Sequence, residues 1–260
     1  MTGEAAVRLN KYSEVRESIY GKHVRSSDML LTGLIYGCTA VSLLILVGIL
    51  GYTFVRGIPH VTWSFLSTAS SAVKGTFGIL GNIINTIYIV VITLLIATPI
   101  GVGSAVYLNE YAKPGKIVRM IEFTTETLSG IPSIIFGLFG MVFFGNTIGL
   151  GYSILTGSLT LTLMILPLIT RTTQEALKTV PDSYRHGALG IGATKWYMIR
   201  TILLPSAMPG IVTGVILAIG RIVGESAALL FTAGSGYYLP KNILGKIFES
   251  GGTLTTQLYL

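Results

Sequence analysis

Two residues of opposite charge, Arg221 and Glu225, interrupt an otherwise uncharged apolar stretch in the last quarter of the chain. They are four positions apart, a spacing that places two side chains on the same face of an α-helix. A guanidinium offers two parallel hydrogen bonds to a tetrahedral oxyanion, and a nearby carboxylate can hold that guanidinium extended or accept a proton. The spacing therefore predicts an anion-binding position, with a purely structural ion pair as the alternative.

Few other residues have types or spacings that support chemistry. The single cysteine, Cys38, excludes an internal disulfide and a zinc site built from cysteines, and the three histidines share no ligand-type spacing. A glycine-rich loop followed by lysine, which cradles nucleotide phosphates, is absent from the sequence. We therefore expect no catalytic residue, no metal and no cofactor in this chain. Glu126 is a weaker candidate for the same anion path, because an acidic residue at the start of a helix is more often simply solvated.

The elements that must position these residues are membrane spans. The chain has 260 residues, of which 51% are hydrophobic and 11% are charged, and its mean hydropathy is +0.71. Soluble domains carry about 25% charged residues, so this composition excludes a soluble globular protein. Because a charge in hydrocarbon is costly, long uncharged runs predict spans. Five such spans are expected, at 29–55, 83–108, 128–144, 150–170 and 206–233.

Residues 1–28 are expected to form a cytoplasmic tail in front of one transmembrane domain, 29–260. This tail and the segments after the second and fourth spans hold most of the 18 lysines and arginines, and such residues stay on the cytoplasmic side. The tail is no cleaved signal, because the apolar run after it is long enough to remain in the membrane. The basic residues form no stripe with interleaved aromatics, so the net charge of +7 does not indicate nucleic-acid binding.

The segment between the fourth and fifth spans, 171–205, is far longer than the 2 to 8 residues or so that connect helices in a bundle. Its pattern predicts two short helices, over 184–189 and 195–203, with a hinge at Gly192 and a capping hydroxyl at Thr194. Such a pair would form a compact knob that projects into the cytoplasm. A merely amphipathic surface loop is the alternative.

The same segment resembles the signature of the permeases of ABC-type importers, the family of binding-protein-dependent transport inner membrane components. That signature reads Glu-Ala-Ala, three residues, Gly, nine residues, Ile-x-Leu-Pro. The matching positions are His186, Gly187, Ala188, Gly192, Ile202, Leu204 and Pro205. His186 and Gly187 depart from the signature, which has Glu and Ala there, whereas the spacing is met throughout. The resemblance implies that an ATPase subunit grips this segment, which is therefore called the coupling loop, 171–205.

Four further segments resemble the PstA type of permease, which belongs to phosphate importers. They are 130–139, 171–181, 190–196 and 220–226. The resemblance implies an all-α polytopic transmembrane bundle with the MetI-like permease fold and six spans. Residues 257–260 can begin a sixth span, so we expect that span to be missing at the C-terminal end. The resemblance also assigns Arg221 and Glu225 to the substrate path, where Glu225 could accept a proton from dihydrogen phosphate.

The implied assembly contains an ATP-binding subunit dimer, a homologous sister permease in a heterodimer and an extracytoplasmic phosphate-binding protein. ATP and Mg²⁺ would be bound by the ATPase, and this chain would lie in the cytoplasmic membrane as a multi-pass protein surrounded by lipid. We therefore expect a permease subunit that moves inorganic phosphate into the cytoplasm. Sulfate, molybdate or phosphonate are alternative substrates. A proton-coupled secondary transporter that uses Arg221, Glu225 and Glu126 as a relay is a less favoured alternative, because such a carrier has no partner for the coupling loop.

Overall fold

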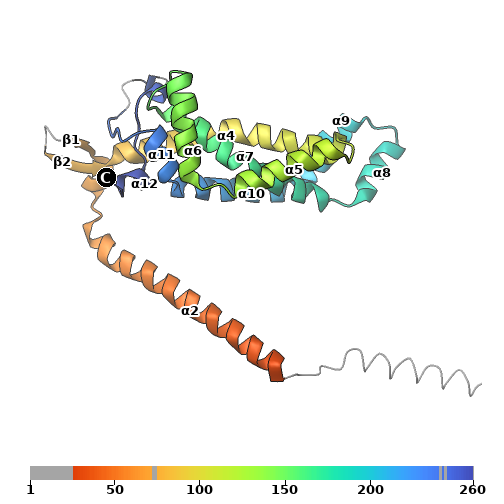
Figure 1. Cartoon of the computed structure of the whole chain (residues 1–260), viewed down its shortest axis with the longest axis horizontal. Coiled ribbons are helices and arrows are strands. Elements are labelled where there is room, and N and C mark those ends of the chain that lie inside the picture. The colour runs from red at the N-terminus through yellow and green to blue at the C-terminus, as the bar shows by residue number, and fades with distance from the viewer. Residues whose placement is uncertain (1–25, 72–74, 240–241, 243–244, 260) are drawn as a thin grey trace, which may run out of the picture. The chain divides into compact units, whose positions relative to one another are not determined.

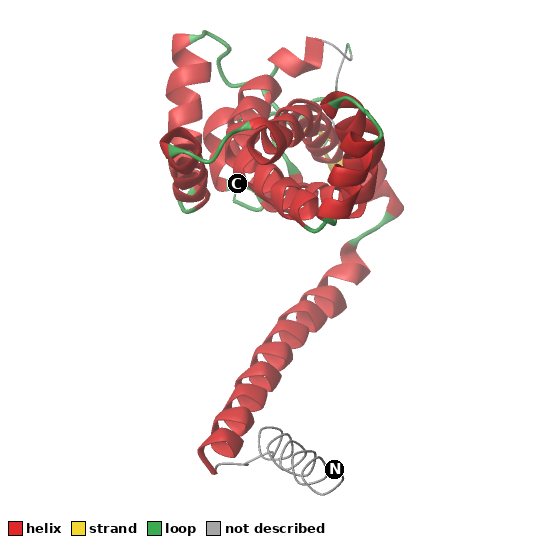
Figure 2. Cartoon of the chain, turned by 90° about the vertical axis from the view of Figure 1, so that its right-hand side faces the viewer, coloured by secondary structure: helices red, strands yellow, loops and turns green. Residues whose placement is uncertain are grey.

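The computed structural model describes residues 26–71, 75–239, 242 and 245–259, and most of them are helical (Figure 2). The chain divides into two units, one ending at Thr62 and one beginning at Trp63. In the first unit, helix α2 (Ser26–Gly57) is followed by the short helix η1 (Ile58–His60). Most of the expected tail, 1–28, lies outside the described residues. At about 1.5 Å per residue, the 32 residues of α2 are long enough to cross a bilayer.

The second unit begins with a short helix and a hairpin and continues as a helical bundle. The hairpin strands β1 and β2 are antiparallel, with Ala69 opposite Ile79 and Ser71 opposite Thr76. The first elements are α3 (Trp63–Ser67), β1 (Ala69–Ser71), β2 (Thr76–Ile79), α4 (Leu80–Val106), η2 (Tyr107–Tyr111), α5 (Lys116–Ser129), α6 (Ser133–Gly140) and η3 (Met141–Thr147). The later elements are α7 (Ile154–Lys178), α8 (Asp182–Gly190), α9 (Lys195–Met198), η4 (Ile199–Leu203), α10 (Leu204–Gly224), α11 (Ala227–Thr232), η5 (Gly245–Phe248) and α12 (Leu254–Gln257).

The long helices α4, α7 and α10 lie side by side, with α8 at one end of this bundle and the hairpin at the other (Figure 1). Small residues let these helices approach closely, as helices in lipid require. A side chain at Gly101 of α4 would overlap Ile169 of α7, and one at Gly214 of α10 would overlap Thr172. The core between the helices is apolar. Its fully buried members include Ile89, Ala97, Leu161, Ile165 and Ala218.

Within the described residues, four helices are long and apolar enough to span a membrane, and a fifth span is added if α5 and α6–η3 count as one. The chain bends by 101° between α5 and α6, so the expected span 128–144 includes this bend rather than one straight helix. α7 continues to Lys178, well past the expected end at 170. The connection between α7 and the last long helix is accordingly shorter than the coupling loop as defined, 171–205, because the first residues of that range belong to α7.

The last long helix differs most from the prediction. It runs without interruption from Lys195 to Gly224, so the second short helix expected over 195–203 is the beginning of this span and not a separate helix. Its turns over η4 are π-helical, and the amide of Leu204 bonds to the carbonyl of Ile199. Proline has no N–H to donate and its ring crowds the preceding turn. The wide π-turns directly before Pro205 let the helix continue past it.

Candidate functional site

Arg221 lies in the last turn of α10, a helix that packs along α7. Gly214 of α10 faces Thr172 of α7, and beyond the end of α10 Leu229 of α11 faces Gly157. Arg221 is halfway along the chain between these contacts and is half-buried. Within the described part of the chain its guanidinium has no ion-pair partner. The guanidinium also donates no hydrogen bond to another described residue, so its donors remain available to an anion.

Glu225 follows the end of α10 and does not continue that helix. Its backbone is extended, with φ −80° and ψ 127°, so the prediction that Arg221 and Glu225 share one helical face is wrong. The Oε1 of Glu225 accepts a hydrogen bond from the amide of Ala228 at 3.1 Å, which caps the first turn of α11. Ser226, the N-cap residue of α11, makes no side-chain cap itself, so the preceding Glu225 supplies the acceptor. The helix therefore breaks at the position where sequence periodicity would continue it.

The C-terminal segment packs against this break. Thr255 of α12 donates its hydroxyl to the carbonyl of Glu225 at 2.7 Å. Asn82 and Asn85, both buried near the start of α4, hold the same segment, because their amides donate to the carbonyl of Gly252 at 3.0 and 3.1 Å. α4, α10, α11 and α12 thus meet around the end of the helix that carries Arg221.

Glu126 lies apart from these residues, on α5. Its Oε1 is 3.4 Å from Nη1 of Arg171, and Arg171 also approaches Glu175 at 3.8 Å. The side chains of Glu126 and Arg171 are 67% and 55% exposed. They line a charged cavity of about 240 Å³ together with Glu122. The structure therefore joins Glu126 to α7 and not to Arg221 or Glu225.

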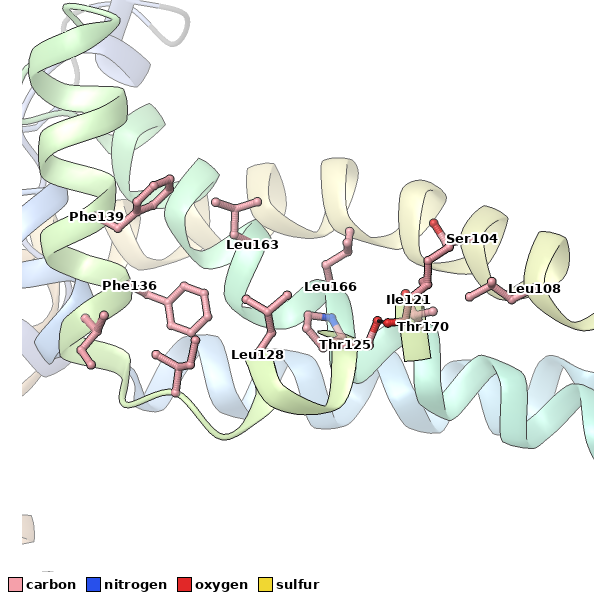
Figure 3. A pocket seen from close by; sticks show the side chains of 13 residues that line it. Ser104, Leu108, Ile121, Thr125, Leu128, Phe136, Phe139, Leu163, Leu166 and Thr170 are labelled. Atoms are coloured by element: carbon pink, nitrogen blue, oxygen red, sulfur yellow. Dashed lines mark hydrogen bonds between the residues drawn. The ribbon is translucent and has the colours of Figure 1, made fainter. Parts of the chain in front are cut away.

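A larger cavity, of about 450 Å³, lies between α4, α5, α6 and α7. Figure 3 shows Leu128, Phe136 and Leu163 around it, with hydroxyl groups such as that of Thr125 as its polar part. None of the residues that line it carries a charge. Its chemistry fits apolar groups and does not fit an anion.

The coupling loop folds around α8. The side chain of Thr194 accepts a hydrogen bond from the amide of Tyr197 at 3.3 Å, so the expected cap is confirmed. Among the signature residues, His186 and Gly187 are exposed, whereas Ala188 is buried against a second apolar cluster that includes Leu177. The remaining signature positions, Ile202, Leu204 and Pro205, lie in η4 and the first turn of α10.

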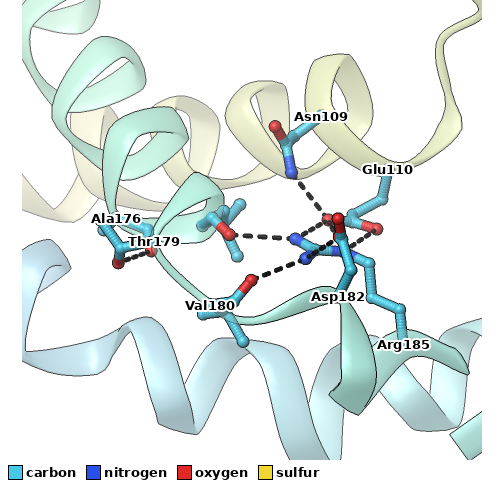
Figure 4. A network of polar contacts seen from close by, with 8 residues as sticks. Asn109, Glu110, Ala176, Thr179, Val180, Asp182 and Arg185 are labelled. Carbon is cyan, nitrogen blue, oxygen red and sulfur yellow. Dashed lines mark hydrogen bonds and ion pairs between the residues drawn. The ribbon is translucent and has the colours of Figure 1, made fainter. Parts of the chain in front are cut away.

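Sequence reasoning missed one polar pair, Glu110 and Arg185, which joins η2 to α8 (Figure 4). Nη2 of Arg185 is 2.9 Å from Oε1 of Glu110, and the two side chains are 17% and 5% exposed. The carboxylate of Glu110 raises the pKa of Arg185, so this guanidinium remains charged. The residues are 75 positions apart. The sequence signal that could have indicated this pair is Glu110 itself, a lone acidic residue directly after a long uncharged run.

Comparison with known proteins agrees with this architecture. Residues 97–259 match the family described as binding-protein-dependent transport system inner membrane component. The chain is 43% identical over 208 residues to the probable ABC transporter permease protein YqgI of Bacillus subtilis, covering 80% of this chain and 71% of that protein. It is 35% identical over 219 residues to the phosphate transport system permease protein PstA of Haemophilus influenzae, covering 84% and 77%.

An inward-facing structure of the MetNI methionine ABC transporter matches with a TM-score of 0.50 at 24% identity, over 70% of this chain and 76% of that one. This match and the helical bundle confirm the expected permease fold. The family places the protein in the inner membrane as a multi-pass transport component and not as the catalytic subunit. The chain belongs to the family of binding-protein-dependent transport system inner membrane components, the permease subunits of ABC importers.

Proposed function

We propose that this permease subunit carries inorganic phosphate into the cytoplasm, with Arg221 as a transient ligand of the anion. The observation that carries the proposal is the half-buried guanidinium of Arg221, which has no ion-pair partner among the residues that the structure describes. The planar fork of arginine binds two oxygens of a tetrahedral oxyanion. The relative from Haemophilus influenzae is named for phosphate transport, which supports phosphate among the oxyanions.

Glu225 contributes to this site through the helix break. Because its side chain bonds to the first turn of α11, α10 ends at Gly224, in the turn that carries Arg221. The break leaves the guanidinium at the end of a helix instead of inside one. A single arginine also holds phosphate weakly enough for release, as transport requires. Glu126 would act farther along the same path, toward the end of α7 that carries Arg171.

The proposed assembly follows the family. Two ATP-binding subunits hold ATP and Mg²⁺ and contact the exposed side of the coupling loop, at His186 and Gly187. A homologous sister permease completes the membrane part, and an extracytoplasmic binding protein delivers phosphate. The N-terminus is cytoplasmic in this arrangement, because the basic residues of the chain concentrate in the tail and in the coupling loop.

Closure of the ATP-binding subunits would move the coupling loop and tilt α7 and α10, which exchanges inward for outward access. ATP and phosphate each shift this equilibrium only by their difference in affinity for the two states. The proton-relay alternative is disfavoured by two contacts. Glu126 pairs with Arg171, and Glu225 caps α11, so the three relay residues do not form one network.

Uptake by the reconstituted complex tests the proposal. The permease pair, the ATPase and the binding protein are placed in liposomes, and entry of radiolabelled phosphate is measured with and without ATP. We expect uptake that requires both ATP and the binding protein and that excess sulfate or molybdate does not inhibit. Uptake driven by a proton gradient without ATP would contradict the importer, and preferential uptake of another oxyanion would contradict phosphate as the substrate.

A further inference from the structure

Arg185 uses every donor of its guanidinium, in the ion pair with Glu110 and in contacts beside it. Nη2 and Nε of Arg185 donate to Glu110, at 2.9 Å and 3.3 Å to Oε1. The other donors reach the carbonyl of Leu177 at 2.9 Å, the carbonyl of Val180 at 2.9 Å and Oδ1 of Asp182 at 3.0 Å. Arginine has five N–H donors, and all five are satisfied here. Figure 4 shows these contacts converging on Arg185.

These contacts join three elements that also pack together through an apolar cluster, which includes Val106, Leu177 and Ala188. Glu110 belongs to η2, the π-helical end of α4, whereas Leu177 lies in the last turn of α7. Val180 lies between α7 and α8, and Asp182 begins α8. The amide of Asn109 donates to Oε1 of Glu110 at 2.7 Å and so orients the carboxylate. Because the side chain of Glu110 is only 5% exposed, this pair is little screened by water, unlike an exposed ion pair.

The next residue of η2 makes a second contact with the coupling loop. Nζ of Lys195 lies 4.8 Å from the ring centroid of Tyr111, a distance at which a cation and an aromatic face attract each other. Lys195 is the first residue of α9 and begins the continuous helix that ends at Gly224. Adjacent residues of η2 therefore hold both sides of the coupling loop, α8 through Arg185 and α9 through Lys195. π-helical turns often occur at functional positions of this kind.

We propose that Glu110 and Tyr111 form a clamp, a pair of positioning residues that fix the coupling loop to the end of α4. A displacement of α8 by the ATPase is then carried to α4 and to the helix of Arg221 together. The inference rests on the proposed function, because it takes the coupling loop as the contact with the ATPase. Neither residue touches the substrate. Without the clamp, apolar packing is left to hold α8 to α4, so more ATP is hydrolysed for each phosphate carried.

The test compares ATP hydrolysis with phosphate uptake in the reconstituted full complex. Glu110→Gln removes the charge and keeps the shape, and Tyr111→Leu removes the aromatic face whereas Tyr111→Phe keeps it. Glu175→Gln is the matched control, because it removes an ion pair whose glutamate side chain is 68% exposed. Changes within such contact networks alter coupling by about 2- to 30-fold. We expect the number of ATP molecules hydrolysed per phosphate to rise about 10-fold in Glu110→Gln and in Tyr111→Leu, and to stay unchanged in Tyr111→Phe and Glu175→Gln.

An equal number of ATP molecules hydrolysed per phosphate in wild type and in Glu110→Gln would overturn the clamp. A proportional fall of ATP hydrolysis and phosphate uptake would also overturn it, because such a fall indicates a merely structural role. If Glu110→Gln fails to assemble, the clamp is tested by comparing the ATP hydrolysed per phosphate in Tyr111→Leu with that in Tyr111→Phe, and equal values would overturn it. Hydrogen exchange of residues 182–190 gives a readout that does not depend on the substrate. Exchange should rise in Glu110→Gln and not in Glu175→Gln, and unchanged exchange would overturn the clamp. A wild-type complex without phosphate uptake would refute the proposed function instead.

Discussion

Gly192 ends α8 with a left-handed backbone, φ +84°. The amide of Gly192 donates to the carbonyl of Leu189 and that of Ala193 donates to the carbonyl of Ala188, both at 3.0 Å. These are the two hydrogen bonds of a Schellman turn, in which glycine is the preferred residue. A Cβ at Gly192 would meet no atom within 4 Å. Backbone strain and not crowding therefore restricts this position to glycine.

Replacement of Gly192 by alanine should weaken the turn after α8. The left-handed conformation costs about 1–2 kcal/mol for a residue with a Cβ, and thermal unfolding of the purified permease should show a loss of that size. Gly190→Ala is the control, because Gly190 also faces open space but has no positive φ. ATP-driven uptake should fall in Gly192→Ala only. Equal stability of the two variants would contradict this account of the turn.

At the residue scale, roles that depend on neighbours in sequence could be predicted, whereas pairings between residues far apart in sequence could not. Gly192 and Thr194 stand out because caps and hinges depend on neighbours in sequence. Arg221 stands out because a charge in an apolar run is costly wherever it lies. The pairing of Glu110 with Arg185 depends on how α4 packs beside α7, and hydropathy contains no information on that packing.

At the scale of elements, the broken span illustrates what periodicity misses. The apolar run 206–233 has no proline at 224–226, and its two charged residues are four positions apart, so it predicts one helix in spite of Gly224 and Ser226. The break forms because Glu225 caps α11 and its carbonyl accepts the hydroxyl of Thr255. The hydrogen bond from Thr255 is tertiary, and the cap by Glu225 lies inside an apolar run, so hydropathy predicts neither of them. The π-turns of η4 are equally hidden, because a change in hydrogen-bond register leaves hydropathy unchanged.

Substitutions of Glu225 separate its capping role from a role in proton transfer. Glu225→Gln keeps an oxygen that accepts from the amide of Ala228, so we expect uptake close to that of wild type. Glu225→Ala removes the acceptor and should cost about 1 kcal/mol of stability, with loss of uptake. The measurement is phosphate uptake normalised to the permease inserted in the membrane. Abolished uptake in Glu225→Gln, with normal stability, would show that the negative charge or a proton on it is required.

The C-terminal segment depends on a buried amide of α4. Asn85 donates to the carbonyls of Gly236 at 2.9 Å and Gly252 at 3.1 Å. Asn85→Ala would remove two hydrogen bonds, although the carbonyls keep other donors in Asn82 and the amide of Gly252. At about 0.5–1.5 kcal/mol for each bond, the loss should be about 1–3 kcal/mol of unfolding free energy. Asn146→Ala, at an exposed position of η3, should be neutral. Thermal unfolding in detergent measures both, and a neutral Asn85→Ala would show that the segment is held by other contacts.

At the scale of the whole molecule, charge placement predicts which stretches are apolar but not where helices end. Uncharged runs correspond to parts of α2, α4, α7 and α10, because only apolar residues suit a lipid environment. α7 nevertheless extends past the uncharged run to Lys178. Its polar end is helical because Arg171 and Glu175 form an i,i+4 ion pair and Gln174 and Leu177 pack inside the unit. Helix ends depend on such packing rather than on hydropathy.

The most direct measurement is phosphate uptake by Arg221→Lys in the reconstituted complex, compared with Arg221→Ala and with the exposed control Arg119→Lys. Lysine keeps the charge but loses the planar fork, and one charge-assisted hydrogen bond is worth about 1.5–3 kcal/mol. We therefore predict that Arg221→Lys lowers uptake per inserted permease at least about 10-fold, while Arg119→Lys is unaffected. Normal uptake by Arg221→Lys, with Arg221→Ala reducing only the amount inserted, would contradict the account and make Arg221 a structural residue.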